Sequence, residues 1–328
     1  MSGIQPSGHL HIGNYIGAIS FWVDEQDRYE NFFMVADLHA LTNPESVTAD
    51  ELRSRTREVI GLYLASGLDP LRSVIFRQSH VAAHTELAWI LNCVTPIGWL
   101  QRMTQFKAKA KTSASTPINT GLLTYPILQA ADILLYQADY VPVGEDQIQH
   151  IELTRDIAER FNSLFGRLFR LPSPLSRESG AKVMGLDDPT IKMSKSRVLE
   201  HPGHAILMLD DPDTIRRKVM RATTDSRSAV DRSSISAGIH NLLVLYATLC
   251  RKRLAQAVER FEGERYTILK EAVAEAIVET LRPIQERYQS LMADHRYIDE
   301  VTVNGAIRAG EIASVTVGKA KRLVGLKD

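Results

Sequence analysis

Short apolar runs alternate with helical patterns over the first part of the chain, and this alternation restricts the fold more than any other feature of the sequence. The apolar runs are bounded by polar or turn residues and cover residues 2–4, 31–37 and 74–76. A helical pattern fills residues 51–64, between the last two runs. Strands that alternate with helices favour a parallel sheet with crossover helices. The sequence therefore predicts an α/β fold for this part of the chain.

The strand pattern stops after Pro202, and the rest of the chain is predicted to be helical. Apolar residues recur at three- and four-residue spacing in residues 241–261, 269–284 and 306–323. A chain of 328 residues is long enough for two domains. We therefore expect an α/β domain over residues 1–202 and an α-helical domain over residues 203–328.

Composition excludes several classes of protein. Lys plus Arg and Asp plus Glu number 39 each, so the overall charge does not indicate a nucleic-acid binder unless basic residues cluster locally. The isolated Cys93 and Cys250 exclude a four-cysteine metal site within the chain and favour a reducing compartment. No apolar run approaches the roughly 18 residues of a membrane span, and the chain has no recognisable signal peptide. We expect a cytoplasmic protein with no membrane partner and no protein-bound metal.

The segment from Gly8 to Asn14 has the pattern of a turn of small residues that opens a helix. The apolar residues that follow recur at helical spacing, at Ile12, Ile16, Ile19 and Val23. Backbone N–H groups at a helix N-terminus suit a phosphate, and Gly8 and Gly13 leave room for one because they carry no Cβ. The alternative is an ordinary turn before an amphipathic helix.

A second segment, Lys192-Met193-Ser194-Lys195-Ser196, places two ammonium groups three residues apart between hydroxyls. Lys192 and Lys195 are suited to stabilise the negative charge that builds up as a phosphate bond breaks. The alternative is a solvated loop. The presence of both segments in one chain favours phosphate chemistry over either alternative.

Residues 107–120 begin with three lysines at alternate positions and continue as a Ser/Thr/Ala/Pro stretch without a hydrophobic stripe. The simpler interpretation is a surface loop. The alternative is a flexible basic flap that folds over a triphosphate.

The helical segment 123–137 carries polar side chains on one face. These are Tyr125, Gln129, Asp132 and Tyr136, at positions i, i+4, i+7 and i+11. The remaining positions are largely apolar, so the Asp132 carboxylate needs hydrogen-bond donors around it. It serves either as a structural residue for its neighbours or as the acceptor for a ligand N–H.

Residues 140–143 are predicted to form a strand that leads into Gly144-Glu145-Asp146-Gln147. Such a turn at the carboxyl edge of a parallel strand is where α/β proteins bind ligands. Glu145 and Asp146 are candidates for a ribose hydroxyl and Gln147 for an amine, while a plain helix N-cap is the alternative for Asp146. His39 follows the second strand at the same edge. Any metal is expected to be Mg²⁺ carried by ATP.

These segments resemble the bacterial and mitochondrial tryptophanyl-tRNA synthetases, which are class I enzymes. The resemblance covers nearly the whole chain and is carried by residues 2–14, 103–107, 121–136, 141–161 and 192–196. The Gly144–Gln147 turn, with Gln149 and His150 after it, is more discriminating than the two class-wide segments, because tyrosyl enzymes carry different residues there.

The resemblance implies a fold, a reaction and partners. The fold would be a Rossmann-like parallel-sheet nucleotide-binding domain with an inserted connecting segment at about residues 43–120, followed by an α-helical anticodon-binding domain. The reaction would be activation of L-tryptophan by ATP, with Mg²⁺, to an aminoacyl adenylate, and transfer to tRNA(Trp). The family is homodimeric, and a homodimer is expected here.

The resemblance also implies roles for single residues. The residues expected around ATP are Gln5, Pro6, Ser7, His11, Gly13, Asn14, Gly144, Glu145, Asp146, Val183 and residues Lys192, Met193, Ser194, Lys195 and Ser196. The residues expected around tryptophan are Asp132, as acceptor of the indole N–H, with Tyr125, Gln129, Gln147 and His39. Lys192, Lys195 and Lys109, the last on the flap, are expected to stabilise the reacting phosphates.

The sequence departs from the family pattern in three places. The first strand lacks its usual N-terminal residues, which suggests that Met1 is a late start. Gln129 stands where many bacterial members have Met. After Ser196, the usual Asp-rich continuation is replaced by Arg197-Val198-Leu199-Glu200, which is expected to alter closure of the lysine loop.

Other functions stay open at this point. One is a class I synthetase for tyrosine, and another is a non-catalytic paralogue that binds tRNA. A basic cluster at Arg216, Arg217, Lys218 and Arg221 is either a tRNA contact or a solvated helix face.

Overall fold

A three-stranded parallel sheet lies at the centre of the computed structural model, which describes residues 1–107, 119–175, 182–198 and 200–328. Its strands are β1 (Ser2–Ile4), β2 (Asn31–Val35) and β3 (Ser73–Arg77), in the order β1-β2-β3. Ile4 pairs with Val35, and Val35 with Arg77. The three predicted strands and the α/β fold are confirmed. β2 ends before Asp37, because Asp37 begins the short helix α3 (Asp37–Ala40).

A second, two-stranded parallel sheet joins β4 (Tyr140–Pro142) to β5 (Ser173–Leu175). β4 confirms the strand predicted at residues 140–143, whereas β5 was not predicted. β4 lies beside β1, because the Met1 amino group donates to the Tyr140 carbonyl oxygen at 3.3 Å and the Ser2 hydroxyl donates to the Pro142 carbonyl oxygen at 3.3 Å. These contacts place the turn that follows β4 at the same edge of the molecule as the ends of β1 and β2.

Helices cover both faces of the central sheet, because alternate residues of β2 point to opposite sides. On one side Phe33 and Val35 pack with two groups of helices. One is the continuous series α1 (Ile12–Asn14), η1 (Tyr15–Ile19) and α2 (Ser20–Glu25), and the other is α4 (Ala49–Ala65). On the other side Phe32 and Met34 pack with α5 (Ala83–Val94), α6 (Ile97–Gln101), α8 (Thr120–Leu134) and α9 (Ile148–Phe165). The short 3-10 helices are η2 (Pro44–Ser46), η3 (Gln78–His80) and η4 (Glu145–Gln147), and α10 (Lys195–Val198) is a short α-helix.

Local sequence sets where several helices begin and end. Thr48 and Glu51 form a capping box at the start of α4, with the Glu51 side chain accepting from the Thr48 N–H at 2.8 Å. Gly166 ends α9 with a φ of 105°, a value that favours glycine. The capping box explains why α4, predicted over residues 51–64, begins at Ala49; the helix ends at Ala65.

The C-terminal part is helical, as predicted. Its helices are α11 (Pro212–Met220), α12 (Ala237–Leu249), α13 (Leu254–Phe261), α14 (Tyr266–Ala293) and α15 (His295–Leu323). The segment predicted as one helix over residues 241–261 is interrupted, and Arg251 has a φ of 53° between α12 and α13. α14 continues through Pro283.

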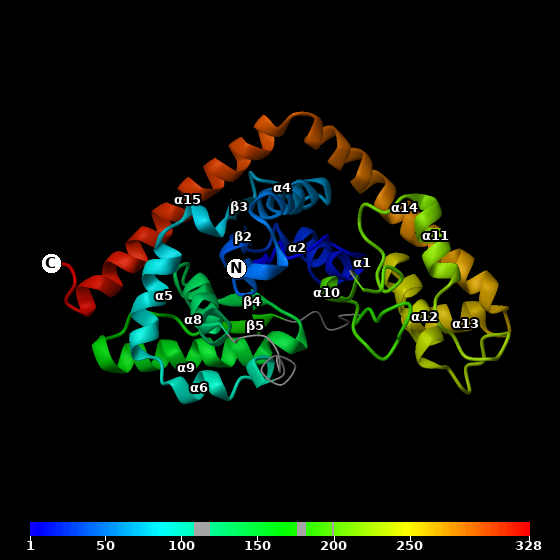
Figure 1. Cartoon of the computed structure of the whole chain (residues 1–328), viewed down its shortest axis with the longest axis horizontal. Coiled ribbons are helices and arrows are strands. Elements are labelled where there is room, and N and C mark those ends of the chain that lie inside the picture. The colour runs from blue at the N-terminus through cyan, green and yellow to red at the C-terminus, as the bar shows by residue number, and fades with distance from the viewer. Residues whose placement is uncertain (108–118, 176–181, 199) are drawn as a thin grey trace.

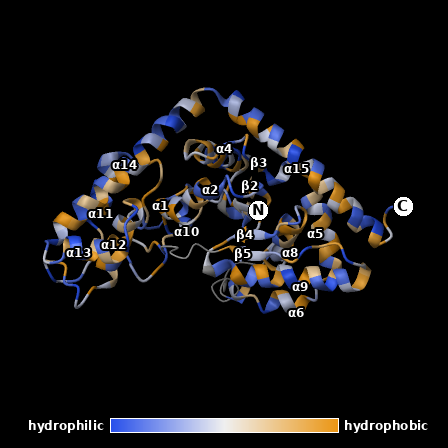
Figure 2. Ribbon diagram, turned by 180° about the vertical axis from the view of Figure 1, so that it is seen from behind, coloured by the Kyte–Doolittle hydropathy of each residue, from blue (hydrophilic) through white to orange (hydrophobic). Residues whose placement is uncertain are grey.

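The two long helices α14 and α15 form the arms of an inverted V around the rest of the molecule (Figure 1). Hydrophobic and hydrophilic residues alternate along both arms (Figure 2), as expected for helices with one buried side. α15 returns to the α/β part and packs on β3, where a Cβ at Gly305 would lie 1.9 Å from the Ile75 carbonyl oxygen. The helical region thus contacts the sheet that positions the site.

Within the described ranges, no helix combines the length and the apolar content that a membrane span needs.

Candidate active site

The two lysine- and glycine-containing segments singled out in the sequence meet in space. The Lys195 Nζ atom donates to the main-chain carbonyl oxygen of Gln5 at 2.8 Å. A Cβ at Gly8 would lie 3.2 Å from the Lys195 Cβ, so the lysine stem packs against the backbone of the first segment. The end of β1 and the start of α10 therefore form one wall of a common site.

The helix predicted after the first segment is present, and Ile12, Ile16 and Ile19 are buried as expected. It continues from α1 through the π-helical η1 into α2. The prediction of unpaired N–H groups at its start is wrong for Ile12, whose N–H donates to the Ile206 carbonyl oxygen at 2.9 Å. The Asn14 side chain accepts from the His11 N–H at 3.1 Å and so fixes the first turn.

His11 is buried beneath this first turn. A Cβ at Gly13 would lie 2.9 Å from its Nδ1 atom, so glycine at this position allows the ring to pack close to the backbone. Burial, together with the nearby charge of Lys195, lowers the pKa of His11 to about 3. The ring is therefore neutral at physiological pH.

A hairpin over residues 183–193, called the lysine hairpin below, carries Lys192. Its two arms are joined where the Met193 N–H donates to the Val183 carbonyl oxygen at 3.0 Å and the Gly185 N–H to the Ile191 carbonyl oxygen at 2.8 Å. Val183 and Met193 are buried. The hairpin thus presents Lys192 from a fixed base.

Lys192 reaches across to the turn after β4. Its Nζ atom donates to the Asp146 Oδ1 atom at 3.0 Å, and both side chains are about half exposed. Burial acts to raise the pKa of Asp146, but the hydrogen bond from Lys192 outweighs it and the pKa lies below its usual value. Asp146 therefore pairs with the lysine in this structure.

Lys195 differs from Lys192 in its surroundings. Burial lowers its pKa to about 7, with a small opposing effect of the Glu58 charge. Desolvation of this kind strengthens the attraction for any anion that enters the site. In this structure, Lys195 therefore donates to a neutral main-chain oxygen, whereas Lys192 pairs with a carboxylate.

Asp132 lies on α8 at the opposite side of the site and is 1 % exposed. Its Oδ1 atom accepts from Gln78 Nε2 and from His84 Nδ1, each at 2.7 Å. Its Oδ2 atom accepts from His39 Nε2 at 2.8 Å. Because each carboxylate oxygen has about two acceptor positions, the contacts among the described residues saturate Oδ1 and leave one position on Oδ2.

The network around Asp132 fixes its charge. Burial alone would raise the pKa, but hydrogen bonds from His39 and His84 bring it down to about 2. The Tyr136 hydroxyl lies 2.9 Å from His84 Nε2 and donates to it, which leaves the His84 N–H on Nδ1 for Asp132. The carboxylate is therefore ionised and held in one orientation.

Tyr125, one helical turn before Gln129, faces the same site. Its hydroxyl donates to Gln105 Oε1 at 3.0 Å and accepts from His150 Nε2 at 2.9 Å. Burial raises the pKa of Tyr125 to about 12. The amides of Gln129 and Gln147 lie 3.4 Å apart, which brings α8 and the turn after β4 together.

The structure thus gathers most of the predicted site residues around one space. The segment Gln5–Ser7 ends β1, His39 lies on α3, and Ser194 follows the lysine hairpin. Lys109 and the side chains of Glu145 and Ser196 lie outside the described residues, as does most of the predicted flap. Within the described part, no group of three or more His, Cys, Asp or Glu residues is arranged to hold a metal ion.

Residues 1–282 match the family described as tRNA synthetases class I (W and Y). The tryptophan–tRNA ligase of Wolinella succinogenes is 48% identical over 325 residues, which are 99% of this chain and 98% of that protein. The chain is a member of the class I tryptophanyl-tRNA synthetase family.

Solved structures agree with this membership. The tryptophanyl-tRNA synthetase of Mycoplasma pneumoniae has a TM-score of 0.91 at 35% identity, over 99% of this chain and 96% of that chain. That of Campylobacter jejuni, solved with ADP and tryptophan, has a TM-score of 0.82 at 35% identity and covers 99% of both chains. The Rossmann-like α/β fold with helical C-terminal part, expected from the resemblance, is confirmed.

Sequence reasoning missed three residues that the structure places around the site: Gln78, His84 and His204. It named His150 only as part of the discriminating segment after β4 and gave it no role, although the ring contacts Tyr125. Of the three, only His84 had a usable signal, because it is a polar residue within the apolar helix α5. The other two lie in turns, where polar residues are common.

Proposed function

We propose that this chain catalyses the ATP-dependent activation of L-tryptophan to tryptophanyl-adenylate and the transfer of the aminoacyl group to tRNA(Trp). The observation that carries the proposal is the full-length similarity to a tryptophan–tRNA ligase, at 48% identity. The similarity extends over 99% of the chain, and so over the turn after β4 and over residues 8–14 and 192–196, which are called the first and second signature segments below. The activity is an adenylation followed by acyl transfer, so it belongs to the ligases.

The contact between Lys195 and Gln5 supports a nucleotide site between β1, α1 and the lysine hairpin. ATP would lie there with its phosphates toward the lysines. The residues proposed to bind it are Gln5, Pro6, Ser7, His11, Gly13, Asn14, Gly144, Glu145, Asp146, Val183, Lys192, Met193, Ser194, Lys195 and Ser196. Phosphate oxygens would supply the main ligands of an accompanying Mg²⁺.

Lys192 and Lys195 would act on the phosphates by electrostatics and positioning. In this structure each lysine amine is held by an oxygen of the protein, from Asp146 and from Gln5. The phosphates of ATP would take the place of both oxygens as partners of the lysines. The lysines would then stabilise the departing pyrophosphate near the first segment. Lys109 is proposed to join them from the flap.

The free acceptor position on Asp132 Oδ2 supports a tryptophan site on α8. The indole N–H is the only polar group of the tryptophan side chain, and a buried ionised acceptor penalises any side chain that lacks the donor. His39 shares the same oxygen. Tyr125, Gln129 and Gln147 are proposed to line or orient the amino acid.

We place the tRNA contacts on the helical part, with residues 203–328 as the anticodon-binding domain and residues 1–202 as the catalytic domain containing the connecting segment at residues 43–120. β3 and α4 lie within that segment and are part of the central α/β structure. On α11 and just after it, Arg216, Arg217 and Arg221 are exposed. Lys218 is instead turned inward, where it pairs with Asp210 at 2.6 Å.

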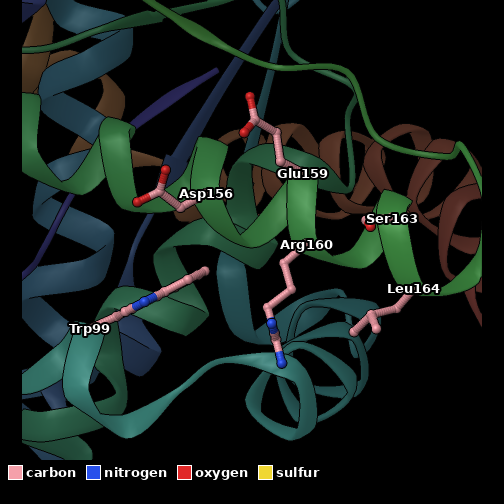
Figure 3. A pocket seen from close by; sticks show the side chains of 6 residues that line it. All are labelled: Trp99, Asp156, Glu159, Arg160, Ser163 and Leu164. Carbon is pink, nitrogen blue, oxygen red and sulfur yellow. The ribbon is translucent and has the colours of Figure 1, made fainter.

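A homodimer is supported by apolar side chains that are exposed on neighbouring helices. Trp89 on α5 is 70% exposed, Ile97 on α6 61% and Leu164 on α9 53%. Figure 3 shows Leu164 and Arg160 beside a hollow of about 450 Å³ that Trp99 also lines. A second copy would cover this surface. Trp89→Glu with Leu164→Glu should give a monomer in sedimentation, and an unchanged dimer would contradict this surface assignment.

The proposed function is tested by aminoacylation of tRNA. Purified protein, ATP, Mg²⁺ and radiolabelled tryptophan should charge a tRNA(Trp) transcript and leave a tRNA(Tyr) transcript uncharged. Charging of tRNA(Tyr) with tyrosine alone would favour the tyrosine enzyme. A protein that binds tRNA(Trp) but charges no tRNA would be the non-catalytic paralogue. We propose the cytoplasm as the site of the reaction, where tRNA charging serves translation.

A further inference from the structure

The segment His204–Met208 follows the second signature segment in the sequence. In the structure it contacts the first signature segment on one side and the lysine hairpin on the other. The Ile12 N–H donates to the Ile206 carbonyl oxygen at 2.9 Å, and the Met208 N–H donates to the Leu10 carbonyl oxygen at 2.8 Å. The segment therefore pairs, in antiparallel fashion, with the turn that opens α1. Its first residue, His204, connects it to the lysine hairpin.

His204 makes three contacts with the lysine hairpin. Its carbonyl oxygen accepts from the Leu186 N–H at 3.0 Å. Its ring lies 2.6 Å from Asp187 Oδ1 through Nδ1 and 3.3 Å from the Lys192 carbonyl oxygen through Nε2. The side chain is 0% exposed. A single buried residue thus contacts both arms of the hairpin.

The ring of His204 occupies a space that exists only because residue 185 is glycine. A Cβ at Gly185 would lie 2.2 Å from His204 Cε1 and 2.4 Å from its Nδ1 atom. The other side of the hairpin is held by Asn241 of α12, whose amide donates to and accepts from the Met184 backbone at 3.0 and 2.9 Å. The hairpin is therefore fixed from both sides.

Both ring nitrogens of His204 face acceptors on the lysine hairpin, the Asp187 carboxylate and the Lys192 carbonyl oxygen. A neutral imidazole donates to one of the two and an imidazolium to both. In either form the ring is hydrogen-bonded to the hairpin.

The charged groups near the ring come from several elements. Asp187 and Asp188 belong to the lysine hairpin, and His201 lies 3.9 Å from the other Asp187 oxygen. His11, on the first signature segment, is close enough for its ring to interact with that of His204.

We propose that His204 is a positioning residue for the adenylation reaction: its buried ring contacts the lysine hairpin at Asp187 and at the Lys192 main chain, and so holds the hairpin in register with the first signature segment. This inference rests on the proposed function.

The test is tryptophan-dependent exchange of pyrophosphate into ATP, measured for the unaltered protein, His204→Phe and His204→Gln, with active sites counted by adenylate burst. His204→Phe keeps the ring beside Gly185 but has no N–H. It should lower kcat about tenfold and change the KM for tryptophan by less than about twofold.

His204→Gln separates positioning from a merely structural role. Its side chain has an N–H donor that His204→Phe lacks, so it should recover part of the lost kcat. The KM for tryptophan should stay within about twofold of the unaltered value in both variants.

His240→Phe, the same change at an exposed position of α12, is the matched control and should match the unaltered protein. A His204→Phe enzyme with full kcat, or a His204→Gln enzyme with no more kcat than His204→Phe, would overturn the inference. If His204→Phe does not fold, His204→Gln alone decides: a lower kcat with an unchanged KM for tryptophan is expected, and an unchanged kcat would overturn the inference. Absence of tryptophan-dependent exchange in the unaltered protein would instead refute the proposed function.

Discussion

Lys195 and Gln5, which are 190 residues apart in the sequence, are joined by a hydrogen bond of 2.8 Å from the lysine Nζ atom to the glutamine carbonyl oxygen. The bond brings the second signature segment onto the end of β1. It also buries the amine, which lowers the pKa of Lys195 to about 7. The same residue is thus held in place and made sensitive to the arrival of an anion.

ATP binding should take up a proton above neutral pH. Near pH 8, Lys195 is mostly neutral in the free protein, and phosphates beside it would raise its pKa and protonate it. Calorimetry of ATP binding in buffers with different ionisation enthalpies measures this uptake. Lys195→Met should abolish most of it, and Lys327→Met, at the exposed C-terminus, should not. Equal uptake by both variants would contradict the role assigned to Lys195.

Asp132→Asn should weaken tryptophan binding far more than ATP binding. The substitution keeps the shape of the side chain but places an amide N–H where an ionised oxygen accepts from His39. Loss of a hydrogen bond to a charged acceptor predicts an increase of the KM for tryptophan by about tenfold or more. The KM for ATP serves as the internal control. Equal increases in both constants would indicate general damage to the site rather than a specific indole contact.

His150 should make the folded protein sensitive to acid. Burial lowers the pKa of His150 to about 4, and its Nδ1 atom has no hydrogen-bond partner in the described structure. Between pH 6.5, the ordinary value, and about 4, the unfolded chain binds a proton on this ring that the folded chain does not. Stability is therefore lost as the pH falls through this range.

Urea denaturation at several pH values measures that loss. His150→Gln should reduce the pH dependence of the free energy of unfolding, by at most about 1.4 kcal/mol per pH unit. His240→Gln, at an exposed position, should leave it unchanged. A His150→Gln slope equal to that of the unaltered protein would show that another group, such as His11, accounts for the sensitivity.

The exposed arginines of the basic cluster should contribute to tRNA binding. Arg217→Glu with Arg221→Glu should lower the association constant for tRNA. The slope of its logarithm against the logarithm of salt concentration should become shallower by about 1 for each phosphate that is no longer neutralised. Arg322→Glu, near the far end of α15 (Figure 1), is the matched control. Filter binding at several salt concentrations measures the effect. An unchanged slope would mean that these arginines form a solvated helix face and do not contact tRNA.

Local patterns predicted most of the central sheet and the helices beside it. The strands at residues 31–35 and 73–77 are short apolar runs with polar ends, and α4 begins at a capping box. β5, in contrast, is the segment Ser173-Pro174-Leu175, and a proline gives no strand signal. It pairs because β4 lies beside β1, which depends on contacts more than 130 residues apart.

The sequence predicted the site residues that carry reactive or charged groups in an unusual context, but not the residues that hydrogen-bond to them. Asp132 and Lys195 are conspicuous because of a carboxylate on an apolar helix and a lysine among hydroxyls. Gln78 and His84 saturate one oxygen of Asp132, but their partner is 54 and 48 residues away. Likewise, no local sequence pattern predicts that the Ile206 carbonyl oxygen accepts the hydrogen bond from the Ile12 N–H, because the two residues are far apart in the sequence.

The most direct test of the central claim is exchange of radiolabelled pyrophosphate into ATP, with tryptophan and tyrosine compared side by side on the same preparation. The full-length similarity to a tryptophan–tRNA ligase predicts exchange that depends on tryptophan, with tyrosine giving background at the same concentration. Exchange with tyrosine and none with tryptophan would contradict the account.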